Sequence, residues 1–356
     1  MDKNLHLVVM AGGTGTRFWP HSRQTRPKQF LDILGTGRSL LQMTCDRFEP
    51  IIPKTNHLIV SNVSYEKILK QQFPKYSKSQ FYLEPMRKNT APCIALAAYK
   101  LRKKDPNGIM IVAPADHAIF QENKFIQVIQ KAIETAREGK LVTIGIKPTR
   151  PETGYGYIQY LEGKGDVRKV KTFTEKPELE LAEKFVESGE FVWNTGIFVW
   201  SVAAIIEAFE KYEPELAEIF DEGTNYYHTW RERKYVESAY AQCRSISIDY
   251  AIMEKAENVH VVLGDFGWSD LGSWSSVHEL RAKDEHGNVL TGEALLYDCT
   301  NNFIHMPNGK MAVIDGLSDF LIADFNDVLV VCKKDGSAKF QKYIKEIKKT
   351  KGEKLL

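Results

Sequence analysis

The chain has 356 residues, and its 48 lysines and arginines against 46 aspartates and glutamates leave a formal net charge of +2. That near balance argues against a nucleic-acid-binding or membrane-surface protein, because such proteins usually carry a basic excess or patch. Hydrophobic residues make up 43% and charged residues 26% of the chain, an ordinary globular composition that excludes fibrous and disordered classes. The length fits one large domain and a smaller one.

The sequence carries no signal for export or membrane insertion. No run approaches the ~20 consecutive apolar residues of a membrane helix, and the segment before Gly12 lacks the apolar core and cleavage site of a signal peptide. The five cysteines are widely spaced without a CxxC pair, which argues against a disulfide framework or a zinc site. We therefore expect a cytoplasmic protein with no nucleic-acid partner and no membrane partner.

Short apolar runs alternate with helical patterns in the first half of the chain, which predicts a parallel sheet covered by helices on both faces. Apolar residues between Phe125 and Arg137 recur at helical spacing, and Asn89-Thr90 before Ala-Pro-Cys indicates a helix cap followed by a first-turn proline. The predicted strands cover residues 5–10, 56–60, 80–83, 109–113 and 141–146.

The pattern changes in the second half. Strands are predicted over 154–160, 167–173, 191–200 and 259–263, a helix over 177–188, and mostly helix over 202–256, where Pro214 begins a new helix. Short β-like segments follow at 288–297, 303–305, 311–314, 320–323 and 328–332, and the tail 338–349 is predicted to be a basic amphipathic helix with a solvated face. We expect an α/β domain over residues 1–280 and a small β-rich domain over 285–356 that ends in a helix.

The strongest local signal is a glycine-rich turn directly after the first predicted strand. Glycines let backbone N–H groups approach an anion closely, and the amides of such a loop form a nest for phosphate. The turn is not a Walker A loop, because no Gly-Lys-Ser/Thr follows, and it lacks the GxGxxG of dinucleotide loops. A purely structural tight turn is the alternative. The candidate phosphate-binding residues are Ala11, Gly12, Gly13, Thr14 and Gly15.

Two basic side chains follow this turn. Arg17 could bind a polyphosphate through its guanidinium fork, and Lys28 could do so as a point charge. Either side chain taken alone is equally well a solvated surface residue. Their position after a glycine-rich turn favours a polyphosphate clamp.

Seven segments, in order along residues 5–275, resemble motifs of the sugar nucleotidyltransferases. The first, AGGTGTRFWPHSRQTRPKQFL, begins at Ala11, and its Phe-Trp-Pro variant is similar to the mannose-1-phosphate guanylyltransferases, also called GDP-mannose pyrophosphorylases. The other six are LEP with KNTAP at 83–92, PADH at 114–117, GYGYI at 154–158, FTEKP at 173–177, WNTGIF at 193–198 and WSDLGSW at 268–274.

The resemblance implies an α/β fold with a Rossmann-like, mixed and mostly parallel sheet of the nucleotidyltransferase type. It also implies a small, β-helix-like C-terminal domain. Bifunctional members of the family carry a further isomerase domain, and the residues after the last motif are too few for one. We therefore expect the short, monofunctional form, and by family analogy a possible homodimer.

Two aspartates follow predicted strands and are candidate metal ligands. Asp116 comes shortly after the strand 109–113, and Asp270 follows the strand 259–263 and a loop. Both can therefore lie at the carboxyl ends of a parallel sheet, where ligands bind. Two carboxylates suit Mg²⁺, which completes its shell with phosphate oxygens and water, and the resemblance implies that Asp116 and Asp270 share this ion. Taken alone, each is more often a helix cap or a turn residue.

The sugar-phosphate side is predicted from three further motifs. Lys176 offers a cation for a sugar 1-phosphate and Glu175 an acceptor for a sugar hydroxyl, with an exposed ion pair as the alternative. The resemblance implies that Glu175, Asn194 and the backbone of Gly154 hold the hexose and that Lys176 holds its phosphate.

The choice of base is predicted from the LEP segment. Guanine presents N1–H and N2–H₂ donors, so a carboxylate is its natural acceptor, and Glu84 after the strand 80–83 is the candidate. Asn89 or Thr90 could contact the ribose or the base. The alternatives are a helix cap for Asn89 and, for Glu84, a surface ion pair with Arg87 or Lys88.

These residues predict a nucleotidyltransferase that forms GDP-mannose and pyrophosphate from GTP and mannose 1-phosphate, with Mg²⁺ as cofactor. Two alternatives stay open: another sugar-1-phosphate nucleotidyltransferase, and a catalytically silent subunit that binds nucleotide sugars. The predicted catalytic residues are Arg17, Lys28, Asp116, Lys176 and Asp270.

Overall fold

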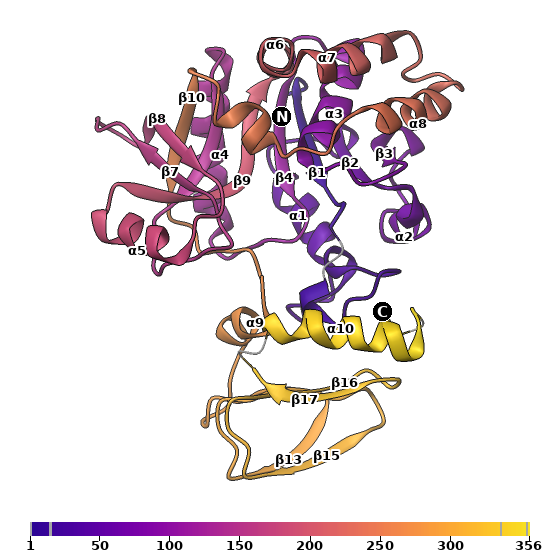
Figure 1. The fold of residues 1–356 in the computed structure, drawn as a ribbon, viewed down its shortest axis with the longest axis vertical. Helices are drawn as coiled ribbons and strands as arrows, with labels where there is room; N and C mark the ends of the chain where they lie inside the picture. Colours follow the sequence, from indigo (N-terminus) through magenta and orange to yellow (C-terminus); the bar gives the residue numbers. More distant parts are fainter. Residues whose placement is uncertain (1, 14–15, 335–336, 354) are drawn as a thin grey trace. The chain divides into compact units, whose positions relative to one another are not determined.

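The computed structural model describes residues 2–13, 16–334, 337–353 and 355–356, which form two compact units (Figure 1). The first unit comprises Met1–Gly12, Met43–Ala115 and Ile119–Trp268. The second comprises Gly13–Gln42, Asp116–Ala118 and Ser269–Leu356. The glycine-rich turn is therefore divided after Gly12, and the basic segment that follows it is grouped with the C-terminal part of the chain.

One nine-stranded sheet forms the centre of the first unit. Its strands are β1 (Leu5–Met10), β2 (His57–Asn62), β3 (Phe81–Glu84), β4 (Ile109–Pro114), β6 (Leu141–Ile146), β7 (Tyr157–Tyr160), β8 (Val167–Thr174), β9 (Phe191–Ser201) and β10 (Val259–Gly264). Their order is β3-β2-β1-β4-β9-β6-β10-β8-β7. β3, β2, β1 and β4 pair in parallel, as do β6 and β10, whereas β8 and β9 run antiparallel to their neighbours. The prediction of a Rossmann-like α/β fold with a mixed sheet is confirmed. The prediction that the sheet is mostly parallel is wrong for the pairings of its strands, because β8 and β9 each run antiparallel to every strand they pair with.

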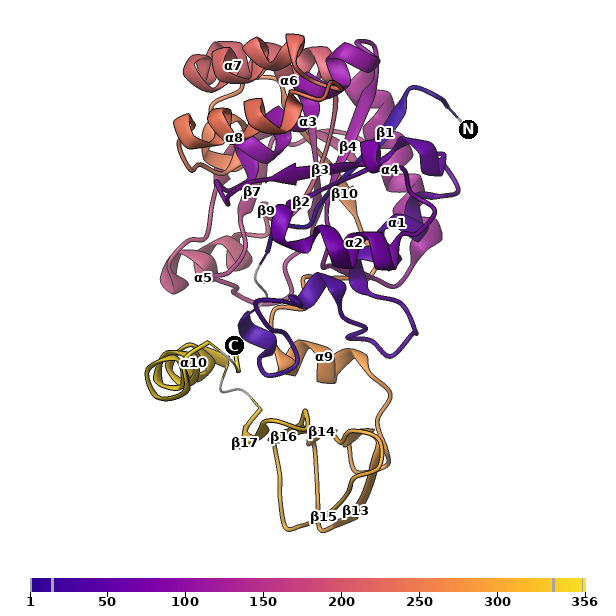
Figure 2. The ribbon, with the colours of Figure 1, turned by 90° about the vertical axis from the view of Figure 1, so that its right-hand side faces the viewer.

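Helices cover both faces of this sheet (Figure 2). α3 (Thr90–Lys104), α6 (Val202–Tyr212) and α7 (Pro214–Asp221) lie on one side, and α4 (Glu122–Arg137) lies on the other. β1, β2, β4 and β6 are buried along nearly their whole length, as strands covered on both faces must be. The other helices of the first unit are α2 (Glu66–Gln72), α5 (Leu179–Ser188), α8 (Glu232–Gln242) and the π-helix η7 (Asp249–Met253), and α1 (Leu40–Phe48) begins in the second unit.

Two predicted boundaries in the first unit are wrong. The strand predicted from residue 154 begins only at Tyr157, because the N–H of Gly154 is held by Glu152 in a turn. The helix predicted from residue 177 begins at Leu179, because Glu178 before it is extended, with ψ at 157°. The predicted start of a helix at Pro214 is confirmed.

The second unit contains two small sheets. β12 (Val289–Thr291), β14 (Phe303–His305) and β16 (Phe320–Asp324) pair in parallel, β17 (Leu329–Lys333) pairs antiparallel with β16, and β13 (Glu293–Tyr297) pairs in parallel with β15 (Met311–Asp315). The single strand predicted over 288–297 is therefore wrong. Gly292 divides it, with φ at +87° and a position where a Cβ would lie 2.3 Å from the carbonyl oxygen of Met306. The remaining helices here are α9 (Trp274–Leu280) and α10 (Ser337–Lys351), and two short strands, β5 (Ala118–Ile119) and β11 (Trp268–Ser269), lie where the chain passes between the units.

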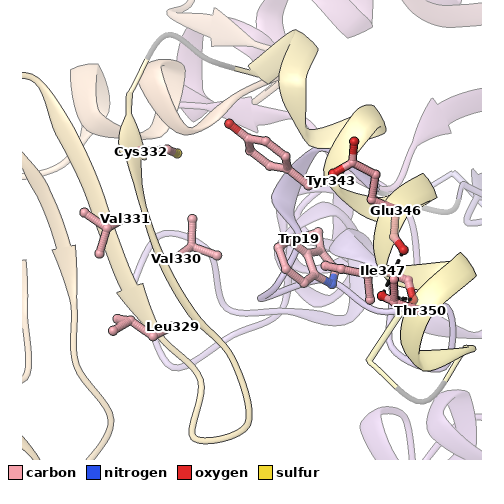
Figure 3. Close-up of a pocket in the computed structure, with 9 residues that line it drawn as sticks. All are labelled: Trp19, Leu329, Val330, Val331, Cys332, Tyr343, Glu346, Ile347 and Thr350. Carbon is pink, nitrogen blue, oxygen red and sulfur yellow. Dashed lines mark hydrogen bonds between the residues drawn. The ribbon is translucent and has the colours of Figure 1, made fainter.

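Trp19 packs beside the C-terminal helix (Figure 3). It lines a groove of about 450 Å³ together with residues of β17 and α10, among them Val330, Cys332, Tyr343 and Ile347. The carbonyl oxygen of Leu355 accepts hydrogen bonds from the Trp19 indole at 2.7 Å and from Arg23 at 2.6 Å. Tyr343 and Ile347 of α10 therefore face Trp19, which belongs to the segment Gly13–Gln42. Among the helices that the structure describes, none has both the length and the apolar character needed to span a membrane.

Candidate active site

The carbonyl groups of the glycine-rich turn are held by the protein. The carbonyl oxygen of Ala11 accepts a hydrogen bond from Ser61 Oγ at 2.8 Å, and that of Gly12 from Arg87 Nε at 3.2 Å. The carbonyl oxygen of Gly13 accepts from Gln29 Nε2 at 2.9 Å. Because these carbonyls point at protein donors, their negative ends are kept from a bound anion. Thr14 and Gly15 lie outside the described residues.

Glu84 is a buried carboxylate at the end of β3. It is 5% exposed, and its Oε1 accepts a hydrogen bond from the hydroxyl of Tyr240 in α8 at 2.9 Å. A Cβ at Gly12 would lie 3.5 Å from Oε2, so the turn and this carboxylate are close neighbours. Arg87 is bonded to Gly12 and to Tyr65, and the alternative of a surface ion pair for Glu84 is wrong.

The charge of Glu84 is set by its surroundings. Burial raises the pKa of Glu84 to about 7, against the hydrogen bond from Tyr240 and the charge of Arg87, which both lower it. Lost hydration penalises the ionised form, and one neutral hydroxyl does not compensate for it. Near neutral pH the side chain therefore exists in both forms and responds to any ligand that offers N–H donors.

Asn89 and Thr90 begin α3. Asn89 adopts φ at +69°, and its Oδ1 accepts the N–H of Thr90 at 2.9 Å, so the alternative of a helix cap is confirmed. The hydroxyl of Thr90 accepts the N–H of Ile248 at 2.8 Å, which ties the start of α3 to the residue before η7. A contact of either residue with nucleotide stays a prediction.

Lys28 links the two predicted metal ligands in the second unit. Its ammonium donates to Asp116 Oδ2 at 3.1 Å and to the carbonyl oxygen of Asp270 at 2.6 Å, and the side chain is 6% exposed. The alternative of a solvated surface position for Lys28 is therefore wrong. Arg17 is exposed and has no ion pair or hydrogen bond with the part of the chain that the structure describes.

The oxygen atoms around Lys28 suit a hard cation. Burial alone would raise the pKa of Asp116, but the ammonium of Lys28, helped by His117, outweighs it and lowers that pKa. Asp270 Oδ1 accepts the N–H of Gly272 at 3.0 Å, which orients its carboxylate. The described residues hold no cluster of three or more His, Cys, Asp or Glu side chains able to bind a metal. Two carboxylates are the number Mg²⁺ takes when phosphate and water complete its shell.

Glu175 and Lys176 form an ion pair after β8. Glu175 is 10% exposed and Lys176 is 60% exposed, so only the lysine extends into solvent. A Cβ at Gly156 would lie 2.7 Å from Glu175 Oε2, which means that the carboxylate occupies space that only glycine leaves open. The alternative of an ion pair between Glu175 and Lys176 is confirmed. Only Lys176 is exposed, because Glu175 is largely buried.

Asn194 in β9 contacts an acidic residue that the sequence did not single out. Its Nδ2 donates to Asp249 Oδ1 at 3.1 Å, and its Oδ1 accepts from Thr143 Oγ1 at 2.9 Å and from the N–H of Gly196 at 3.1 Å. Burial first, and the charge of Glu175 second, raise the pKa of Asp249 to about 7. The sequence signal for Asp249 is an acidic residue within the mostly apolar segment Ile246–Met253. The prediction of mostly helix over 202–256 did not consider this residue separately.

The raised pKa of Glu84 predicts how stability depends on pH. Between pH 4.5 and 7 the folded chain keeps the Glu84 proton that the unfolded chain has lost, so the free energy of unfolding falls as pH rises. The shift corresponds to about 3 kcal/mol. Glu84→Gln removes this contribution, and urea unfolding at pH 5 and pH 8 should show a smaller decline in the variant than in the parent chain.

Glu213→Gln is the matched control for that measurement. Burial raises the pKa of Glu213, but hydrogen bonds from Lys255 and Arg244 outweigh it and the net shift is downward. Glu213 is therefore ionised in both the folded and the unfolded chain across this pH range, and its replacement leaves the decline intact. A Glu84→Gln variant with the parent's full decline would contradict the assignment of a raised pKa.

Comparison with known proteins identifies the family. Residues 6–287 match the family model described as nucleotidyl transferase. A mannose-1-phosphate guanylyltransferase of Escherichia coli is 38% identical over 345 residues, which cover 94% of this chain and 74% of the relative. A putative mannose-1-phosphate guanylyltransferase of Vibrio cholerae is 37% identical, with 96% and 74% covered.

A solved structure agrees over nearly the whole chain. The crystal structure of a mannose-1-phosphate geranyltransferase from Thermus thermophilus is 31% identical, covers 97% of this chain and 99% of its own, and superposes with a TM-score of 0.85. The chain therefore belongs to the nucleotidyl transferase family, and the similarity of its motifs to the mannose-1-phosphate guanylyltransferases is confirmed over most of its length.

Proposed function

We propose that this chain is a mannose-1-phosphate guanylyltransferase that forms GDP-mannose and pyrophosphate from GTP and α-D-mannose 1-phosphate. The names of the relatives support the substrates. The observation that carries the chemistry is the buried ammonium of Lys28, which contacts the carboxylate of Asp116 and the backbone carbonyl of Asp270.

The reaction is an in-line displacement at the α-phosphorus of GTP. A phosphate oxygen of mannose 1-phosphate forms the new P–O bond, and the bond to the leaving pyrophosphate breaks. The nucleophile is already an anion, so no general base is needed. Catalysis then consists of positioning and charge neutralisation. Arg17, Lys28 and the amides of the glycine-rich turn are assigned to the triphosphate, and Lys176 to the phosphate of the sugar.

Mg²⁺, held by Asp116 and Asp270, would supply positive charge at the phosphate oxygens. The chain prepares this site through Lys28, because the ammonium keeps the Asp116 carboxylate ionised and in place. An anionic carboxylate is the form that binds a metal.

Glu84 is assigned to the guanine base. An ionised carboxylate accepts the N1–H and N2–H₂ donors of guanine together, and such charge-assisted pairs are stronger than neutral hydrogen bonds. These donors also favour the ionised form of a side chain that titrates near neutral pH. Nucleotide contacts by Asn89 and Thr90, and a hexose contact by the backbone of Gly154 beside Glu175 and Asn194, belong to the same proposal.

We further infer the division of labour along the chain. Residues 1–280 are assigned to catalysis, and residues 285–356 to a short β-helix-like domain. Val289, Phe303 and Leu321 support the latter, because they occupy one register position in three parallel strands, as stacked coils do. A location in the cytoplasm and a homodimer complete the proposal.

The decisive experiment measures pyrophosphate release with a panel of nucleoside triphosphates and sugar 1-phosphates. The proposal expects the highest kcat/KM for GTP with mannose 1-phosphate, and activity that depends on Mg²⁺. A higher kcat/KM for another pair would identify a different sugar nucleotidyltransferase. No release with any pair would identify a silent binding subunit.

Glu84→Gln should lower the preference for GTP over ATP. A glutamine cannot accept both guanine donors, and a mismatched buried polar group costs about 1–3 kcal/mol, or roughly ten- to a hundredfold in binding. The ratio of kcat/KM for GTP to that for ATP, measured at saturating mannose 1-phosphate, should fall by this factor, with most of the loss on GTP. An unchanged ratio would mean that other groups recognise the base.

Lys176→Ala should separate the two substrates. The ammonium is assigned to the sugar phosphate, so the KM for mannose 1-phosphate should rise about tenfold or more while the binding of GTP, measured by calorimetry, stays within about twofold. Lys184→Ala is the control, because Lys184 is also exposed and ion-paired, to Glu180 in α5. Equal losses for both substrates would contradict the assignment.

Gly156→Ala should displace the Glu175 carboxylate while the fold stays intact. The added methyl would lie 2.7 Å from Glu175 Oε2, and only the end of a flexible side chain has to move. We expect a KM for mannose 1-phosphate raised by about tenfold, a KM for GTP near that of the parent, and a change in stability within ~0.5 kcal/mol. A variant with both KM values unchanged would remove Glu175 from the sugar site.

A further inference from the structure

The side-chain amide of Asn194 has one orientation that its surroundings allow. The N–H of Gly196 can only donate, so the atom 3.1 Å from it is the amide oxygen. Asp249 Oδ1 lies 3.1 Å from the other end of the amide, and in its ionised form this carboxylate accepts a hydrogen bond from the amide nitrogen. The two neighbours lie at opposite ends of the amide, and a flipped amide would place its N–H₂ group against the N–H of Gly196.

This orientation decides what Asn194 can offer to a ligand. Its oxygen is covered by the N–H of Gly196 and by the hydroxyl of Thr143 at 2.9 Å. Its nitrogen donates one N–H to Asp249. The second N–H of the amide makes no hydrogen bond among the described residues. Asn194 is half-buried and therefore presents a donor, whereas the Glu175 carboxylate nearby presents an acceptor.

We propose that Asp249 is a positioning residue that holds Asn194 with its remaining N–H toward a hydroxyl oxygen of the hexose. This inference rests on the proposed function and assigns a specificity role within it. A hydroxyl group both accepts and donates, so a fixed N–H donor beside a fixed carboxylate acceptor recognises the hydroxyls of a sugar. An amide free to flip would offer its oxygen to the ligand as often as its nitrogen and would lose this discrimination.

The local backbone explains how Asp249 reaches Asn194. Asp249 is the first residue of η7, whose Ala251, Ile252 and Met253 are buried in the core of the first unit. The N–H of Ile248 before it is held by the hydroxyl of Thr90. π-turns of this kind are rare and occur frequently at functional sites. The start of η7 is therefore anchored from both sides, and the carboxylate is placed with little freedom.

Electrostatics supports a role beyond packing. Burial and the charge of Glu175 raise the pKa of Asp249, with Lys176 acting against them and Glu254 adding to them. A carboxylate beside other acids destabilises the fold, and a neutral acceptor could hold an asparagine at lower cost.

Two substitutions at position 249 test the proposal. Asp249→Ala removes the acceptor, and the KM for mannose 1-phosphate should rise about tenfold while the KM for GTP stays within about twofold. Asp249→Asn keeps an acceptor oxygen for the Asn194 N–H, so its KM for mannose 1-phosphate should stay within about threefold of the parent value. A KM near the parent value in Asp249→Asn would show that Asp249 acts by orienting the Asn194 amide. A KM raised as much as in Asp249→Ala would show that its negative charge matters instead.

Two further variants keep the test decisive. Thr143→Val removes the hydroxyl from the oxygen side of Asn194, and it should raise the same KM in the same direction even if Asp249→Ala fails to fold. Glu213→Gln alters a buried carboxylate that holds Arg244 and Lys255, and it should leave the ratio of the two KM values unchanged. Asp249→Ala with equal changes in both KM values, or Asp249→Asn as impaired as Asp249→Ala, would overturn the proposal.

The parent chain separates this outcome from failure of the proposed function. A parent chain that forms no GDP-mannose in the substrate panel would overturn the function and this inference with it. A parent chain that is active, with Thr143→Val and Asp249→Ala both unchanged in their KM for mannose 1-phosphate, would overturn the positioning role alone.

Discussion

A carboxylate removed from water stays ionised only where a cation or several N–H donors replace the lost hydration. Asp116 and Glu84 meet this constraint differently. Asp116 contacts the ammonium of Lys28, and its pKa falls below the usual value although burial opposes the shift. Glu84 has one neutral hydroxyl from Tyr240, and burial raises its pKa to about 7. The Asp116 side chain is 38% exposed and Glu84 is 5% exposed, so the contact with a cation and the shallower position both favour the charged form of Asp116.

This difference matches the partners proposed for each acid. A metal ion needs a carboxylate that is already anionic, and Asp116 has that state before any ligand arrives. A nucleobase offers N–H donors, and Glu84 gains its compensation from the ligand itself, so binding and ionisation are coupled. The pKa of Asp249 is also raised to about 7. Its hydrogen-bond donor, the amide of Asn194, belongs to the chain itself.

Much of this arrangement could be predicted from the sequence, and the reason for the rest is physical. The strands β1 and β6 were predicted to the residue because they are buried apolar runs with clear ends. The loop after β1 followed from its glycines, whereas a metal shared by Asp116 and Asp270 stays a prediction. Lys28 was assigned to phosphate, but its contact with Asp116 joins residues 88 positions apart, which no local pattern contains.

The burial of Glu84 and the contact between Asp249 and Asn194 could not be predicted from the sequence for the same reason. A sequence shows that Glu84 follows a strand and lies near Arg87, and a surface ion pair is an equally good reading of that spacing. Only the position of Tyr240, contributed by α8, closes the pocket around the carboxylate. Asp249 contacts Asn194 across 55 positions, and a π-turn has no helical period that would mark its first residue.

Two glycines lie close to the carboxylates of Glu175 and Asp270 and leave space for them. A Cβ at Gly156 would lie 2.7 Å from Glu175 Oε2, and a Cβ at Gly272 would lie 2.7 Å from Asp270 Oδ2. Neither glycine has a positive φ, so neither is needed for an unusual turn. Each instead leaves room for a carboxylate that would otherwise be pushed aside. Gly156 and Gly272 therefore leave space for the carboxylates that are assigned to the sugar and to the metal, and a larger residue at either position would displace an oxygen atom of that carboxylate.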